Sequence, residues 1–143
     1  MEQLPSYLLT QTAAHASRLV TDGFAAVGAR GYHYRMLATL RETGPASQAD
    51  LGRRTGIHFS DVVATLNELT DGGYVERAPD PADRRRNVVT ITERGERRAA
   101  ELLARAHAIQ DELLGPLSPA ERATLTGLLA RMLTHLRAGA TTD

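Results

Sequence analysis

Hydrophobic residues recur at helical spacing along most of the chain. Between residues 6 and 27 the apolar side chains follow one another at steps of three or four, and this spacing predicts a helix. The same spacing predicts further helices over 33–42, 59–71, 93–114 and 119–137. Glycine follows most of these segments, as expected where a helix ends.

A short helix with its own start and stop signals precedes the helix over 59–71. Ser47 and Asp50 form a capping-box pattern that opens it, and Gly56 closes it nine residues after Ser47. Two short helices joined by a tight turn that contains glycine are the layout of a helix-turn-helix. Residues 47–71 therefore predict this motif.

The hydrophobic pattern changes after residue 73. Residues 74–77 and 87–92 predict two short strands, the second of them rich in β-branched residues. The segment 78–86 between them would form the tip of a β-hairpin. The predicted fold class is mainly α with a small β-hairpin wing, that is, a winged helix-turn-helix between N- and C-terminal helices.

Composition narrows the function. The chain has 143 residues and no cysteine, which excludes disulfides, thiolate catalysis and cysteine-ligated zinc. We find no phosphate-binding glycine loop, nucleophile elbow or metal motif, so we expect neither an enzyme nor a bound cofactor. With no long apolar run and no signal peptide, we expect a cytoplasmic protein with no membrane partner.

Charge gives no general argument for nucleic-acid binding. The net charge is zero, and the segment 41–98 holds ten arginines and ten carboxylates. All 17 basic residues are arginine, whose planar fork suits phosphates and guanine edges. DNA binding would therefore depend on where arginines are placed, and we expect a shallow dependence of affinity on salt.

The stretch L-G-R-R-T-G-I, followed by G-G-Y-V-E-R-A-P-D-P-A-D-R-R-R-N-V-V-T-I-T-E-R-G, resembles the MarR family of winged helix-turn-helix transcriptional regulators. The wing signature of that family is an acidic residue, basic residues, and an apolar strand ending in threonine with glycine shortly after. The matching residues are Asp83, Arg84, Arg85, Ile91, Thr92 and Gly95.

The resemblance implies a homodimer on a pseudo-palindromic operator, in a family made up mostly of repressors. It implies an N-terminal dimerisation helix over 1–32, a winged DNA-binding domain over 33–92 and C-terminal dimerisation helices over 93–143. A small molecule, often phenolic or aromatic, commonly binds such proteins between the dimer base and the DNA-binding lobe.

The candidate DNA contacts lie on the helix-turn-helix and the wing. By resemblance, Arg84 and Arg85 would reach the minor groove and Asp83 would hold an arginine in place, while Arg86 is either a phosphate contact or merely exposed. Many relatives carry arginine where Ala64 stands and a small polar residue where Asp61 stands, which leaves the base contacts open. The full candidate set is Ser47, Gln48, Arg53, Arg54, His58, Phe59, Ser60, Asp61, Val63, Ala64, Asn67, Asp83, Arg84, Arg85 and Arg86.

Effector contacts are expected from the first two helices and the loop between them. The arginine could pair with a carboxylate or phenolate, and the aromatic residues could form apolar walls; the alternative is ordinary core and hinge residues. The candidates are His15, Arg18, Leu19, Phe24, Tyr32, His33, Tyr34 and Met36. A zinc-sensing subgroup of the family uses ligands near His15, His33 and His107, but no closely spaced ligand pair occurs here, so no metal site is expected.

Two readings compete with a DNA-binding regulator. The carboxylates of the 59–71 helix and its lack of arginine favour a winged-helix protein–protein module that does not bind DNA. The other rival is an enzyme, for which we find no motif.

Overall fold

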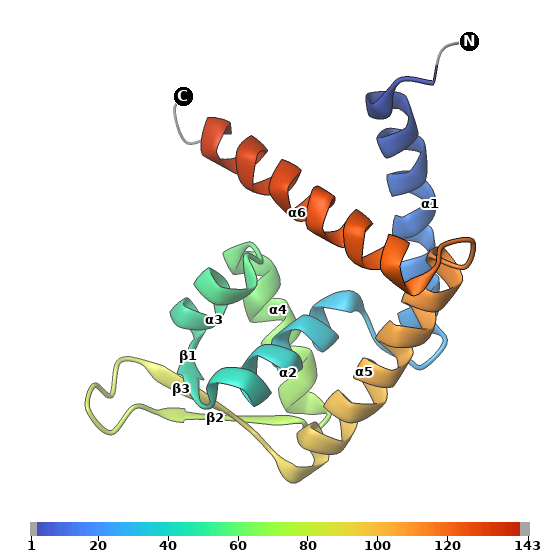
Figure 1. Cartoon of the computed structure of the whole chain (residues 1–143). Coiled ribbons are helices and arrows are strands. Elements are labelled where there is room, and N and C mark those ends of the chain that lie inside the picture. The colour runs from blue at the N-terminus through green and yellow to red at the C-terminus, as the bar shows by residue number, and fades with distance from the viewer. Residues whose placement is uncertain (1–2, 141–143) are drawn as a thin grey trace. The chain divides into compact units, whose positions relative to one another are not determined.

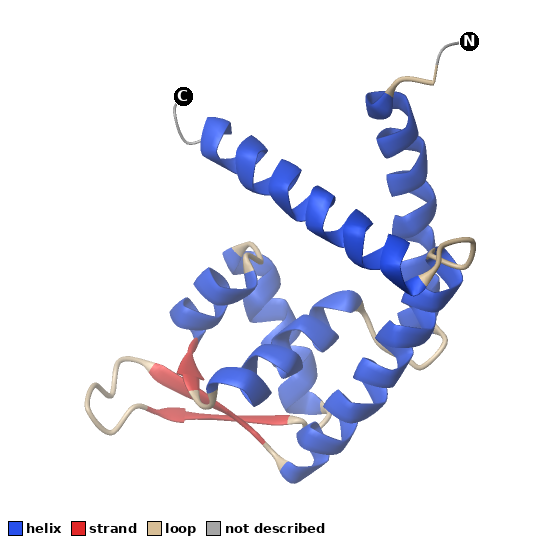
Figure 2. Ribbon diagram, in the orientation of Figure 1, coloured by secondary structure: helices blue, strands red, loops and turns tan. Residues whose placement is uncertain are grey.

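Six helices and three short strands make up the part of the chain that the computed structural model describes, residues 3–140 (Figures 1 and 2). In order they are α1 (Pro5–Ala25), α2 (Gly31–Thr43), β1 (Ala46–Ser47), α3 (Gln48–Thr55), α4 (Phe59–Asp71), β2 (Val75–Pro79), β3 (Asn87–Ile91), α5 (Glu93–Leu113) and α6 (Pro119–Ala140). The chain divides into two compact units, the first ending at Ile109 and the second beginning at Gln110.

The fold class predicted from the sequence is confirmed, and the predicted elements are all present with boundaries shifted by at most about three residues. The helix predicted over 6–27 ends at Ala25, and the one predicted over 33–42 begins at Gly31. The helix predicted over 59–71 is α4, residue for residue. Thr92 caps α5, as its sequence position suggests, because its Oγ1 accepts the backbone N–H of Gly95 at 3.0 Å. The last helix was predicted to end near residue 137, whereas α6 runs to Ala140.

The sheet has three strands in the order β1–β3–β2, all antiparallel. The hairpin of β2 and β3 is in register from Val75 opposite Ile91 to Pro79 opposite Asn87. The first strand was not predicted, because two residues, Ala46 and Ser47, carry no periodicity. Their pairing with β3 is a contact between segments about 40 residues apart in the chain.

The core of the first unit lies where α2, α3 and α4 meet the sheet and the first part of α5. Met36, Leu37, Leu51, Leu66 and Leu102 are fully buried there. Burying side chains of this size contributes about 1.5–3 kcal/mol each, before the loss of chain entropy is counted. This core fixes α3 and α4 relative to the hairpin.

The C-terminal end of α1 is fastened to α5 by two arginines. Arg105 donates from Nε to the Gly23 carbonyl oxygen at 2.6 Å, and Arg98 donates to the Val27 carbonyl oxygen at 2.6 Å. Cationic donors satisfy the carbonyl groups left free at a helix C-terminus and complement its dipole. A Cβ at Gly23 would lie 2.5 Å from Ile109 Cγ1, so any larger residue at this contact would force the Ile109 side chain to move.

In the second unit, the capping box predicted at the start of α6 is confirmed. The Ser118 backbone N–H donates to Glu121 Oε1 at 2.9 Å, and the Glu121 N–H donates to Ser118 Oγ at 3.2 Å. Arg122 pairs with Asp111 across the turn at 2.8 Å.

No residue of α6 is buried. Over the described residues, none of the helices is long and apolar enough to cross a membrane.

Candidate nucleic-acid interface

The helix-turn-helix is built from α3, a short turn and α4. Ser47 Oγ accepts the Asp50 backbone N–H at 3.1 Å and so caps α3, as its sequence pattern predicts. Gly56 ends α3 with a φ of 68°, a left-handed conformation that favours glycine. His58 then caps α4, because its Nδ1 accepts the Ser60 backbone N–H at 3.3 Å.

The second helix of the motif, α4, has one buried and one open side. Val62, Leu66 and Leu69 are at most 2% exposed and face the core, as their spacing predicts. The other side holds every α4 residue proposed from the sequence as a base contact. Its members are Phe59, Ser60, Asp61, Val63, Ala64 and Asn67, of which Asp61 and Val63 are half-buried and the others exposed.

A carboxylate of α4 is neutralised by contacts from the start of α2. Glu68 accepts hydrogen bonds from Arg30 at 2.8 and 2.9 Å, and His33 Nε2 lies 2.5 Å from the same carboxylate. Desolvation raises the pKa of Glu68, but the bonds from His33 and Arg30 outweigh it and hold that pKa below its usual value. This side of α4 is therefore less acidic towards a ligand than the sequence indicates.

The tip of the hairpin between β2 and β3 is an ordered turn that carries three consecutive arginines. Asp80 and Arg86 close it, through a backbone N–H that donates to the Arg86 carbonyl oxygen at 2.7 Å. Asp83 accepts both the backbone N–H and the Nε–H of Arg85, each at 3.1 Å. These bonds hold the pKa of Asp83 below its usual value. The arginine that Asp83 holds is thus Arg85, while Arg84 is exposed beside it.

The third arginine of the tip fastens the wing to the helix-turn-helix. Arg86 donates from a terminal guanidinium nitrogen to Ser47 Oγ at 3.0 Å, the same oxygen that caps α3. Ser47 is 8% exposed and its hydroxyl has two partners, so its position suits a structural role better than a DNA contact. The sequence suggested no partner for Arg86, because 39 residues separate it from Ser47.

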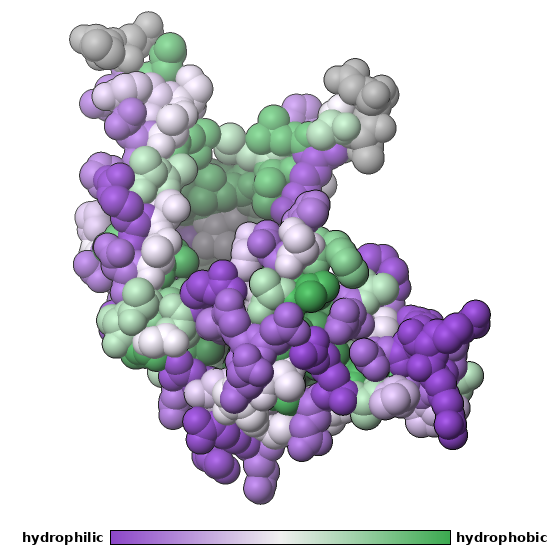
Figure 3. All heavy atoms as spheres, turned by 180° about the vertical axis from the view of Figure 1, so that it is seen from behind, coloured by the Kyte–Doolittle hydropathy of each residue, from purple (hydrophilic) through white to green (hydrophobic). Residues whose placement is uncertain are grey.

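The other candidate side chains around the motif differ in exposure and in whether they are paired with a neighbour. Arg53 pairs with Asp50 on the outside of α3, whereas Arg54 is exposed and Gln48 is half-buried. His58 and Ser60 bond to each other, with His58 Nδ1 2.8 Å from Ser60 Oγ. Figure 3 shows the hydrophilic wing tip standing out from the surface. The open side of α4 and this tip belong to one unit and are joined through β1 and α3.

Comparison with known proteins identifies this arrangement. Residues 28–86 match the model of the MarR family. A probable transcriptional regulator from Pseudomonas aeruginosa of known structure is 32% identical, with a TM-score of 0.79 over 91% of this chain and 97% of that one. The chain belongs to the MarR family. This assignment places it among transcriptional regulators and not among enzymes.

Two further similar proteins are a named repressor and a regulator whose DNA binding responds to a small molecule. The HTH-type transcriptional repressor NicR of Pseudomonas putida is 32% identical over 97 residues, which cover 68% of this chain and about three fifths (61%) of that repressor. The structure of Bordetella bronchiseptica BpsR is 26% identical, with a TM-score of 0.80 over 91% of this chain and 93% of that one. The DNA binding of BpsR is regulated by 6-hydroxynicotinic acid.

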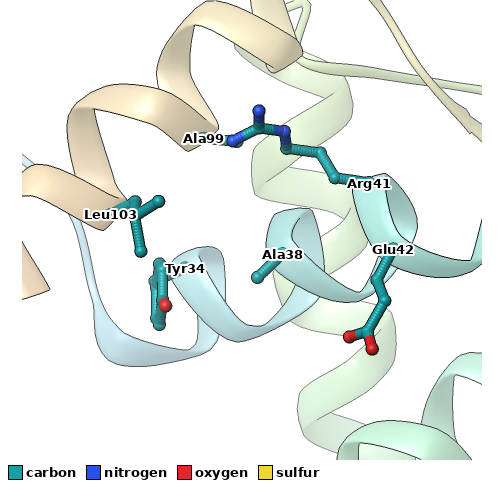
Figure 4. Close-up of a pocket in the computed structure, with 6 residues that line it drawn as sticks. All are labelled: Tyr34, Ala38, Arg41, Glu42, Ala99 and Leu103. Carbon is teal, nitrogen blue, oxygen red and sulfur yellow. The ribbon is translucent and has the colours of Figure 1, made fainter.

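This MarR-family chain has a cavity of about 370 Å³ between α2 and α5 that is widely open to solvent (Figure 4). Tyr34 and Leu103 form its apolar end, and Arg41 reaches across from α2 towards α5. There the Nε of Arg41 pairs with Glu96 at 3.0 Å. The remaining lining residues are Ala38, Glu42 and Ala99.

Of the eight effector candidates predicted from the sequence, Tyr34 alone lines this cavity. Phe24 is buried and stacks on Tyr34, and Met36 is completely buried in the core. His15 and Arg18 bond to each other on the exposed side of α1 at 2.9 Å, and His33 is engaged with Glu68. Leu19 and Tyr32 pack against the core. Arg41 and Leu103 were missed, although both follow the helical spacing of the cavity-facing side chains.

Side chains that could bind a metal are dispersed. Within residues 3–140 no three histidine, aspartate or glutamate side chains come close enough to hold an ion.

Proposed function

We propose that this chain acts as a homodimeric, sequence-specific DNA-binding regulator, and that it represses transcription until a small aromatic molecule releases it from a pseudo-palindromic operator. The observation that carries the proposal is the pair of exposed arginines on a wing fastened to the helix-turn-helix by Arg86 and Ser47. This contact keeps the basic tip at a fixed place relative to α4.

In the proposed complex, α4 of each protomer enters the major groove and the wing lies in the flanking minor groove. Arg84 and Arg85 supply positive charge where a narrow minor groove is most negative. Two recognition helices related by a two-fold axis would contact half-sites about 34–36 Å apart on one side of the duplex. The neutral charge of residues 41–98 means that few phosphates are neutralised, so affinity should fall only slowly with salt.

The cavity between α2 and α5 supports the release step. Its volume of about 370 Å³ suits a single-ring ligand, and it combines apolar walls with one arginine. A ligand carboxylate would compete with Glu96 for Arg41. In the similar protein BpsR, 6-hydroxynicotinic acid regulates DNA binding. This similarity favours an aromatic acid as the chemical class of the effector.

A gel-shift titration on a duplex selected from random sequences by the full-length protein tests DNA binding. The double variant Arg84→Ala/Arg85→Ala should bind about a hundredfold more weakly, because each charged contact contributes about 1.5 kcal/mol. Arg97→Ala removes an exposed arginine of α5 outside the motif and is the matched control. Equal affinity of the double variant and the wild type contradicts the wing assignment, and the absence of any enriched sequence favours a protein–protein module.

The same assay tests release. Adding 6-hydroxynicotinic acid or benzoic acid to the complex should free the DNA from the wild type. It should not do so from Ala38→Phe, which fills the cavity from α2 without removing a contact from α4 or the wing. Release of both proteins at the same concentration rules this cavity out, and no release of the wild type contradicts the aromatic-acid proposal.

A further inference from the structure

The first residue of α4 exposes a large apolar side chain. Phe59 keeps 65% of its surface accessible, the largest value for a large hydrophobic side chain within residues 3–140. Val62, Leu66 and Leu69 of the same helix are packed into the core instead. The packing of the domain therefore does not account for a phenylalanine at this position.

A second apolar side chain lies one turn further along the same side. Val63 stands four residues after Phe59, the spacing that places side chains next to each other on a helix surface. Val63 is half-buried and Ala64 beside it is exposed. Phe59 and Val63 thus form a small apolar surface beside Ser60 and Asp61, at the part of a recognition helix that contacts base edges.

The polar side chains of α4 offer few alternatives for base recognition. The Ser60 hydroxyl is bonded to His58, and Glu68 is held by Arg30 and His33. The helix contains no arginine or lysine, so it has no cation that could donate two hydrogen bonds to guanine. Asp61 and Asn67 remain as hydrogen-bonding groups on this side.

One base carries an apolar group in the major groove, namely thymine with its C5 methyl. We propose that Phe59 and Val63 determine sequence specificity by packing against thymine methyl groups in each operator half-site. This inference rests on the proposed DNA-binding function. The arginines of the wing, which belongs to the same unit, would hold the duplex by its phosphates while the apolar pair of α4 faces the base edges.

The test removes the methyl group alone. In the selected operator, each thymine is replaced in turn by deoxyuridine, symmetrically in both half-sites, and the affinity of the full-length protein is measured. At one or two positions, deoxyuridine should lower the affinity of the wild type by about fourfold for each methyl group removed. Phe59→Ala should bind the thymine operator more weakly by a similar factor and should no longer distinguish thymine from deoxyuridine at the position that Phe59 contacts.

Matched variants separate this contact from a general loss of binding. Asn67→Ala, on the same side of α4, should keep the full response to deoxyuridine, and Phe59→Leu should recover part of it. If Phe59→Ala and the wild type respond equally, or if the wild type responds at no thymine, the inference is wrong although the protein binds DNA. Failure of the wild type to bind any selected duplex instead overturns the proposed function.

Discussion

Gly95 connects the wing to the rest of the first unit. It is buried at the start of α5, where its N–H donates to the capping Thr92 Oγ1. A Cβ at this position would overlap the carbonyl oxygen of Tyr74 and lie 2.7 Å from Ile91 Cγ1. Backbone atoms of the residue before β2 cannot move without disturbing the hairpin, so only glycine fits where β2, β3 and α5 meet.

Gly95→Ala should therefore lower the free energy of unfolding by about 1–3 kcal/mol, the usual cost of forcing extra volume into a packed site. Chemical denaturation monitored by circular dichroism measures it. Gly52→Ala is the matched control, because a Cβ there would meet Val62 Cγ2 at an ordinary 3.7 Å within helix α3. Alanine is favoured over glycine in a helix by up to about 1 kcal/mol, so the control should be neutral or stabilised. Equal stability of the two variants would show that the hairpin tolerates the overlap.

At the scale of elements, α2 and α4 are joined by a polar contact as well as by the core. Glu68 of α4 binds Arg30 and His33 at the start of α2. The Arg30 backbone N–H donates to His33 Nδ1 at 3.0 Å, which leaves Nε2 to carry the proton that faces the carboxylate. The folded state thus favours the ionised form of Glu68, and acid should weaken the contact.

The sign of this pH dependence follows from the lowered pKa of Glu68. Its contribution is complete above the ordinary glutamate value near 4.5 and is lost as the pH falls through the lower folded value. Since the side chain is 46% exposed, the contribution should stay below about 1 kcal/mol. Melting temperatures from pH 7 to pH 3 should show Glu68→Gln less stable than wild type at neutral pH, with the gap closing in acid. A gap that stays constant, or one equally large for the exposed Glu76→Gln, would contradict this.

Local sequence signals were enough to predict the helices and the hairpin. Caps and glycines located α3 and α4 because these signals act within a few residues. A change in periodicity and a run of β-branched residues located β2 and β3. Contacts between distant segments could not be predicted this way. Neither β1 nor the bond from Arg86 to Ser47 has a local signature, and the cavity depends on how α2 and α5 pack.

At the scale of the whole molecule, two helices expose apolar rows that one chain leaves uncovered. No residue of α6 is buried, and its exposed hydrophobic side chains include Leu128, Leu129, Met132, Leu133 and Leu136. The N-terminal half of α1 likewise exposes Tyr7, Leu8 and Leu9. Exposed apolar rows of this kind usually mark an interaction surface. They support the proposal that a second copy of this chain buries them.

Leu129→Glu/Leu133→Glu should convert the protein to a monomer that stays folded, because charged groups in a helix interface lose their hydration. Sedimentation equilibrium measures the mass. The expected value is one chain, against two for the wild type and for Arg131→Glu, which changes an exposed charge of the same helix. A double variant that remains dimeric would show that α6 lies outside the dimer interface.

The bond from Arg86 to Ser47 also limits how this regulator can be recombined with its relatives. Ser47 Oγ accepts bonds both from the start of α3 and from Arg86 of the wing tip. A loop taken from another protein to replace residues 80–86 would therefore remove a partner of the helix-turn-helix as well. A chimera that keeps this geometry would exchange residues 46–91 as one block, so the wing and the recognition helix are a single module for engineering.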